Sequence, residues 1–239
     1  MTQWPPPPRG RPWPWSAPGT PPTPRAVDAK QWDDIAPEHL ARAPAAQPSF
    51  RMVIGCDLAY SDDGAGDWTV LVPMADIAEP ETVPPKYKIH ILDLVRVQVA
   101  LNPLRAMLYR VQQTHPGAPI VSYVNGPEKR IIHLLAEKHI TPEGAVLPGV
   151  YITGMLAKFP KFVRAQALSE AWAEGLVVLP PGRPWTIGLQ EKVTAFTGKP
   201  GDDDDVVDAL VSGYDYLIAS RPAGNDIGAF RFGRAAYER

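Results

Sequence analysis

Apolar and polar positions between residues 50 and 220 follow two rhythms, and these predict strands and helices in a definite order. An apolar run over residues 51–57 predicts a buried strand, and residues 68–74 predict the second strand of a hairpin. Alternation over much of residues 87–99 predicts a third strand. Three consecutive strands, and then helices and strands in alternation, predict an α/β fold with a mixed sheet flanked by helices.

Helical spacing dominates the remainder of this region. Gly175 is well suited to end a helix, because glycine adopts the left-handed conformation that closes many helices. The predicted helices cover residues 103–115, 128–138, 159–174, 187–196 and 203–220. Further strands are predicted at residues 119–124 and 146–152, with a short extended piece at 176–179.

The first 48 residues differ from the rest of the chain. Prolines recur from Pro5 to Pro24 with Trp4, Trp13 and Trp15 among them, and such a segment forms neither a helix nor a strand ladder. We expect an extended or disordered arm, either docking a partner through its aromatic side chains or acting as a tether. Residues 31–43 could form a short helix. The predicted organisation is a Pro/Trp-rich arm (1–48), one domain (49–221) and a loose tail (222–239).

Composition narrows the class of protein. The chain has 239 residues, 45% of them hydrophobic, which is ordinary for a globular protein. Its single cysteine, Cys56, excludes an internal disulfide and a multi-cysteine zinc site. A net charge of −2 argues against coating nucleic acid by bulk charge, but allows a local basic groove. No run is apolar enough to span a bilayer and no signal-peptide core is present, so we expect a cytoplasmic protein without membrane partners.

Candidate chemistry is concentrated in acidic residues at the edges of two elements. Four aspartates, 202–205, run into an apolar helix, and Asp208 lies one turn inside it on the same face as Asp204 and Asp205. The helix dipole favours acids at this end, which explains one or two of them. Asp57 ends an apolar strand, where a carboxylate is costly to bury unless it is paired or metal-bound. Carboxylates converging from a strand end and a helix start predict a divalent-cation site for phosphodiester chemistry.

Each acid also has a simpler reading. Asp57 could be a turn or cap residue, and Asp204 and Asp205 could cap the helix. Asp67 could belong to a hairpin turn. Solvated or loop charge is the expected role of Asp202, Asp203, Asp62 and Asp63.

Several short motifs in this order resemble a known family. The chain resembles the ribonuclease H-like fold, and within it the nuclease domain of the large terminase subunit of tailed phages, over about residues 50–220. The motifs are Gly55-Cys-Asp57-Leu-Ala, Gly66-Asp67-Trp-Thr-Val-Leu-Val, Lys161-Phe-Val-Arg164-Ala, Glu174-Gly-Leu-Val-Val-Leu-Pro180 and Asp204-Asp205-Val-Val-Asp208-Ala-Leu.

The resemblance implies an endonuclease that cuts concatemeric phage DNA into genome lengths with two Mg²⁺ or Mn²⁺ ions. Asp57 would bridge both ions and act in catalysis with Asp204 and Asp205, while Asp67 and Asp208 would be further metal ligands. Lys158, Lys161 and Arg164 lie at helical spacing and would bind DNA phosphates. The implied partners are double-stranded DNA, a small terminase subunit and an ATPase motor, in the host cytoplasm if the chain is phage-encoded.

Two departures from the family leave alternatives open. The family has an acid at the end of the fourth strand, where this chain has Tyr123 or Val124, so Glu128 could substitute as a metal ligand, or Asn125 as a neutral one. The sequence also lacks a Gly-x-x-x-x-Gly-Lys-Ser/Thr loop, so the motor is expected on a separate polypeptide, unless the nuclease works without one. A Holliday-junction resolvase on the same fold and a catalytically silent packaging scaffold or adaptor are the alternative functions.

Overall fold

The computed structural model describes residues 50–59, 67–78, 86–124, 126, 128–141, 144–199 and 201–221. Several sequence predictions lie outside these residues and stay predictions. They concern the arm, the helix over 31–43, the loop acids Asp62 and Asp63, Asn125 as a ligand, and the tail.

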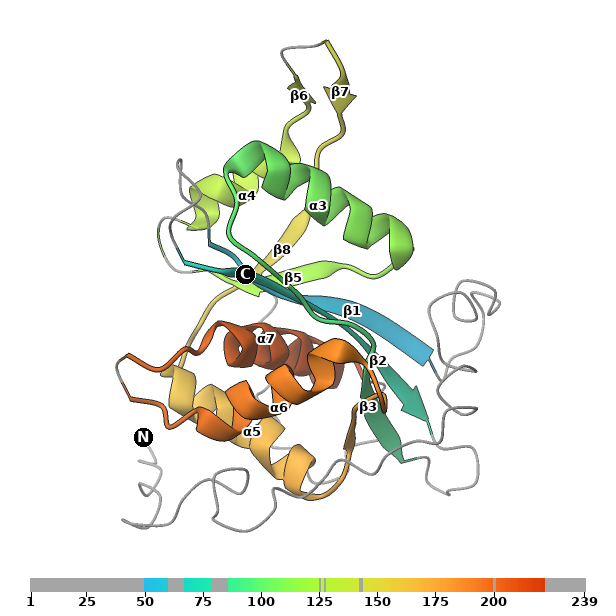
Figure 1. Cartoon of the computed structure of the whole chain (residues 1–239), viewed down its shortest axis with the longest axis vertical. Helices are drawn as coiled ribbons and strands as arrows, with labels where there is room; N and C mark the ends of the chain where they lie inside the picture. Colours follow the sequence, from blue (N-terminus) through green and yellow to red (C-terminus); the bar gives the residue numbers. More distant parts are fainter. Residues whose placement is uncertain are drawn as a thin grey trace.

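A mixed sheet forms the middle layer of the described chain (Figure 1). Strands β1 (Phe50–Asp57), β2 (Thr69–Ala78) and β3 (Tyr87–Ile91) form an antiparallel meander. On the other side of β1, β5 (Ile120–Tyr123) and then β8 (Ile152–Met155) add in parallel. The order β8-β5-β1-β2-β3 is that of the ribonuclease H-like fold, so the predicted fold class is confirmed.

Two short strands complete this sheet. Strand β4 (Val95–Val97) pairs with the start of β2, and β9 (Val177–Val178) runs parallel to β3 at the edge. The predicted third strand is therefore broken into β3 and β4. Between them, Leu92 donates its backbone N–H to Pro73, and Leu94 donates its backbone N–H to the Asp93 carboxylate, which bends the chain.

Helices cover both faces of the sheet (Figure 1). On one face lie α3 (Leu101–Thr114) and α4 (Glu128–Ala136), and on the other lie α5 (Lys161–Ala173), α6 (Pro184–Ala195) and α7 (Asp205–Ala219). A separate apolar core fills the space under each layer. Within the described segments, no helix is long and apolar enough to cross a membrane.

The prediction of one strand over residues 146–152 is wrong. Val146–Leu147 form β7, which pairs with β6 (His139–Ile140) in a hairpin that projects from the α3–α4 layer (Figure 1). Gly149 then passes so close to the end of α4 that an added Cβ would lie 2.0 Å from the Ala136 carbonyl oxygen. The chain enters the main sheet only at Ile152, as β8.

Helix α7 lies directly against β1, and this contact positions the candidate site. A Cβ on Gly55 would lie 2.1 Å from the carbonyl oxygen of Ala209, so only glycine permits this approach. The buried Ser212 hydroxyl accepts the backbone N–H of Cys56 at 3.1 Å. The helix start is thereby held beside the end of β1, where Asp57 lies.

Candidate active site

Asp57 is the last residue of β1 and lies on the face of the sheet covered by α7. Alternation along the strand places Val53 in the α5–α7 core and Ile54 and Cys56 in the opposite core, which gives Asp57 the same face as Val53. Its carboxylate is partly buried and has no hydrogen bond or ion pair with any residue in the described ranges.

Neighbouring carboxylates act on Asp57. Burial raises its pKa to about 7, assisted by the negative charges of Asp208, Asp205 and Asp204, while Lys161 works in the opposite direction. The strand-end acid and the helix-start acids therefore share one field, as the sequence predicted. Mutual repulsion among carboxylates is what a bound divalent cation would relieve, and carboxylate oxygens suit Mg²⁺ and Mn²⁺.

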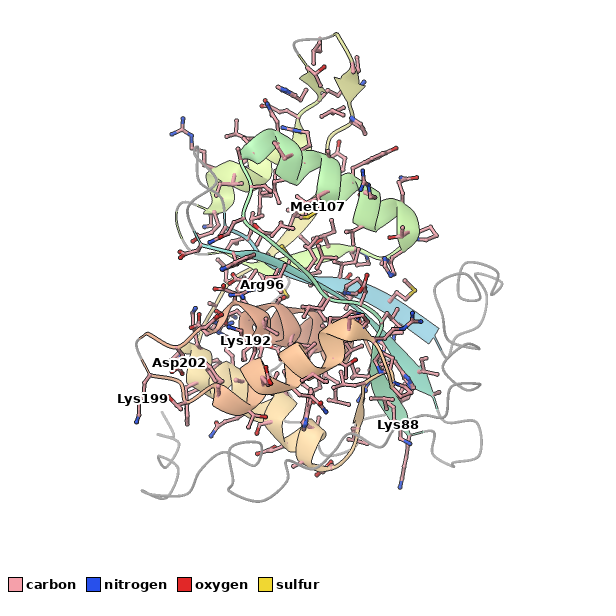
Figure 2. All side chains as sticks on the ribbon, in the orientation of Figure 1. Lys88, Arg96, Met107, Lys192, Lys199 and Asp202 are labelled. Carbon is pink, nitrogen blue, oxygen red and sulfur yellow. The ribbon has the colours of Figure 1, made fainter. Side chains whose placement is uncertain are left out.

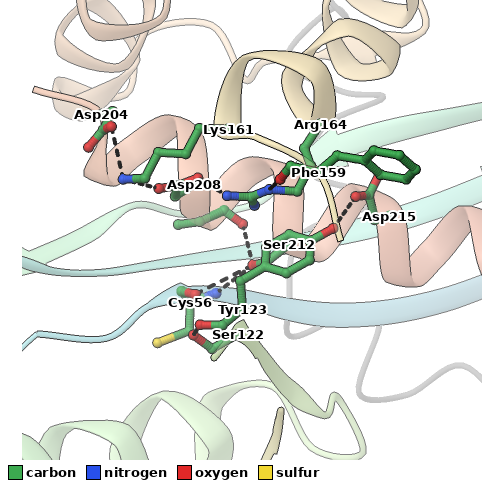
Figure 3. A network of polar contacts seen from close by, with 11 residues as sticks. Cys56, Ser122, Tyr123, Phe159, Lys161, Arg164, Asp204, Asp208, Ser212 and Asp215 are labelled. Carbon is green, nitrogen blue, oxygen red and sulfur yellow. Dashed lines mark hydrogen bonds and ion pairs between the residues drawn. The ribbon is translucent and has the colours of Figure 1, made fainter. Parts of the chain in front are cut away.

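Lys161, the first residue of α5, bridges two of the helix-start acids (Figure 3). Its Nζ lies 2.9 Å from Asp204 Oδ2 and 2.6 Å from Asp208 Oδ2. Burial alone would lower the pKa of this ammonium, but its hydrogen bonds to Asp208 and Asp204 raise the pKa overall, so it stays charged at neutral pH. Asp204 occupies the N-cap position of α7 without a side-chain capping bond, so the capping role considered for it is not observed.

Arg164 approaches the other side of Asp208. Its guanidinium is 8% exposed, and its Nη2 lies 3.3 Å from Asp208 Oδ1. The same group lies 4.0 Å from the ring centroid of Tyr123 and donates to the Phe159 carbonyl oxygen at 3.2 Å. Contact between Arg164 and DNA remains a prediction, but the observed role of this side chain is to hold Asp208.

Tyr123 stands where the resemblance calls for an acid. The parallel register pairs Cys56 with Ser122, so one residue further along, Tyr123 lies beside Asp57 on the same face. Its hydroxyl donates to Asp215 of α7 (Figure 3). Burial raises the pKa of Asp215 to about 6, against the hydrogen bond from Tyr123 and the charge of Arg164, which lower it.

The outer acids of the run are also paired. Asp203 lies 3.0 Å from Arg96 Nη2 and is bonded by Lys192, two cations that flank the start of α7 (Figure 2). Asp202 accepts the backbone N–H groups of Thr197 at 2.8 Å and Lys199 at 3.2 Å, which fixes the loop before α7. These two acids are therefore structural partners and not simply solvated charges.

Asp205 makes the loosest of these pairs. Its Oδ2 lies 3.6 Å from Arg96 Nη2. Burial and the charge of Asp203 raise the pKa of Asp205, while Arg96 lowers it. Asp205 therefore faces Asp57 with part of its charge uncompensated.

The remaining predicted site residues stand apart from these contacts. Asp67 is exposed just before β2, and Lys158 is exposed before α5. Glu128 begins α4, in the helix layer on the other face of the sheet from α7 (Figure 1). Among the described residues as they stand, no three or more His, Cys, Asp or Glu side chains are grouped closely enough to hold a metal ion.

Sequence reasoning missed four residues that shape this site. Arg96 and Lys192 lie far from the acids along the chain, so only the folded structure reveals their pairing. Asp215 carried a signal, because an acid on an apolar helix seven residues after Asp208 shares its face. Ser212 is small and polar on the same helix, and nothing in its local sequence indicates that it binds β1.

Strand order and the acids around Asp57 define a ribonuclease H-like domain with a carboxylate-rich site. No protein-family model matches the chain, and no curated protein matches its sequence. Solved structures that it resembles include the large terminase nuclease from thermophilic phage G20c with bound zinc, with a TM-score of 0.48 and 18% identity over 71% of this chain and 82% of that one.

Two further likenesses are of the same kind. The Mn-soaked human cytomegalovirus terminase nuclease domain gives a TM-score of 0.45 and 13% identity, over 78% of this chain and 90% of that one. The large terminase from another thermophilic bacteriophage gives 0.46 and 10%, over 73% of this chain and 42% of that one. These structures bear the family name that the motifs suggested, and a proposal of function has to rest on the residues of this chain.

Proposed function

We propose that this chain is a metal-dependent DNA endonuclease of the terminase type, which cuts concatemeric phage DNA during packaging beside a separate ATPase motor and a small terminase subunit. One observation supports it most. The unpaired Asp57 carboxylate, at the end of β1, lies in the field of three acids from the start of α7, and their charges help to raise its pKa to about 7.

The residues have distinct roles in this proposal. Asp57 would hold Mg²⁺ or Mn²⁺ with Asp205, and the acids paired to Lys161 would set the charge beside it. An ion bound there would lower the pKa of an attacking water and stabilise the leaving oxygen of a phosphodiester. Lys158, exposed beside α5, and the half-exposed Lys161 would contact the DNA backbone.

The test is nicking of supercoiled plasmid by the purified full chain with Mg²⁺ or Mn²⁺. Asp57→Asn keeps the shape of the side chain but removes its charge, and we expect it to abolish nicking. Glu191→Gln makes the same chemical change at an exposed position on α6 and should leave nicking intact. Equal activity of the wild type and Asp57→Asn would refute the proposed site, and four-way junctions cut in preference to duplex would favour a resolvase.

A catalytically silent scaffold is the second candidate, and a specific observation favours it. Lys161, Arg164 and Arg96 pair with the α7 acids, and Tyr123 replaces the expected fourth-strand acid. A scaffold would show neither nicking nor any divalent-ion dependence of its melting temperature.

A further inference from the structure

Cations already occupy much of the carboxylate site. Asp208 has both oxygens engaged, Oδ1 by Arg164 at 3.3 Å and Oδ2 by Lys161 at 2.6 Å. The same Lys161 ammonium lies 2.9 Å from Asp204 (Figure 3). A divalent ion between Asp204 and Asp208 would therefore have to displace this ammonium, whereas an ion at Asp57 would meet an unpaired carboxylate.

Charge balance points the same way. The acids around the α7 start are Asp57, Asp203, Asp204, Asp205 and Asp208, and the cations paired among them are Arg96, Lys161, Arg164 and Lys192. The cations offset most of this negative charge, so little of it is left for added ions. A first divalent ion would be attracted by the remainder, and a second would be repelled by the first and by the fixed cations.

Tyr123 removes a further ligand on the same side. It lies beside Asp57 in the register of β1 and β5, and its hydroxyl is engaged by Asp215 while Arg164 covers its ring at 4.0 Å. A guanidinium and a phenol therefore stand where a second ion would need another carboxylate.

We propose that the ammonium of Lys161 takes the place of one of the two metal ions, so that this chain binds a single divalent ion, at Asp57. This inference rests on the proposed function and specifies its site. Lys161 is then a positioning residue, which fixes Asp204 and Asp208 and supplies the second positive charge beside the ion.

The test is the number of Mn²⁺ ions bound per full-length chain without DNA, from the loss of the free Mn²⁺ signal in electron paramagnetic resonance. We expect one ion for the wild type and two for Lys161→Met, because the neutral side chain frees Asp204 and Asp208. Lys138→Met is the matched control, since Lys138 is exposed at the end of α4, and it should still bind one ion. Lys161→Gln would replace Lys161→Met if that variant fails to fold.

Two ions on the wild type, or one on both the wild type and the Lys161 variant, would overturn the inference. In either case plasmid nicking that depends on Asp57 would leave the proposed function standing. No bound Mn²⁺ together with no nicking would overturn both.

Discussion

Asp208 shows how a single side chain in this site can be read from its contacts. Its position one turn inside α7 offered two interpretations, a metal ligand or an ordinary helix acid. In the structure it is 8% exposed and held by one lysine and one arginine from α5. A buried carboxylate with two cationic partners is set in place by the fold, so it acts on Asp57 as a fixed charge.

Ser212 gives a residue-scale prediction, because its hydroxyl is the partner of the buried Cys56 backbone N–H. Ser212→Ala leaves that N–H without a partner and should lower the free energy of unfolding by about 1–3 kcal/mol. Denaturant unfolding measures the change.

Ser169→Ala is the matched control for that substitution. The Ser169 hydroxyl is also buried, but it has no hydrogen-bond partner among the described residues. Its removal should be neutral or stabilising. Equal losses at both serines would contradict the role given to Ser212.

Asp215 predicts a pH dependence of stability. Its pKa is raised to about 6 by burial, from 3.8 for an ordinary aspartate, so the folded chain holds this proton more tightly than the unfolded chain. The contribution to stability is therefore present below pH 3.8 and is lost as the pH rises through about 6. Relative to Asp215→Asn, the wild type should lose up to about 3 kcal/mol of unfolding free energy over this window.

Urea unfolding of both proteins at about pH 4 and about pH 7 measures this difference. Asparagine can still accept the Tyr123 hydroxyl, so the variant keeps the hydrogen bond seen for Asp215. The same pH dependence in the two proteins would show that Asp215 does not titrate in this window.

At the scale of the elements, the close passage of α7 over β1 holds the site together. An added methyl at Gly55 would lie 2.1 Å from the Ala209 carbonyl oxygen, so Gly55→Ala must push the helix away from the strand. We expect a loss of about 2–4 kcal/mol in unfolding free energy, the upper range for overpacking. Mn²⁺ affinity should fall as well, because Asp57 and the α7 acids move apart.

Gly188→Ala is the control for that substitution. A Cβ at Gly188 in α6 would meet nothing within 4 Å, so alanine should stabilise the helix by about 0.5–1 kcal/mol. Thermal unfolding of both variants tests the pair. If Gly55→Ala is as stable as the wild type, the packing of α7 on β1 is looser than described.

Much of this arrangement could be predicted from the sequence, for a physical reason. Apolar runs and helical spacing are local, so the strand ending at Asp57 and the helix beginning at Asp205 were expected within a few residues. The break between β3 and β4 was missed, because it depends on a hydrogen bond to Pro73 of the neighbouring strand. Arg96 and Lys192 were missed for the same reason, since their partners lie on other elements.

At the scale of the whole molecule, the site exists only when distant segments meet. Asp57 comes from β1, Lys161 from α5 and Asp205 from α7, so an unfolded chain cannot present these groups together. An ion that binds the folded state alone stabilises it by mass action, by about 2.7 kcal/mol at an ion concentration 100 times the dissociation constant. For a domain of this size, Mn²⁺ should then raise the melting temperature by roughly 5–10 °C over the protein in EDTA.

Asp57→Asn decides whether that rise comes from the proposed site. The variant loses the one carboxylate of the site that has no hydrogen bond or ion pair among the described residues, so its melting temperature should respond little to Mn²⁺. Glu191→Gln should behave as the wild type does. A full Mn²⁺ shift in Asp57→Asn would place the ion elsewhere on the chain. A shift that vanishes only in Asp57→Asn would tie the stability of the whole fold to the meeting of β1 and α7.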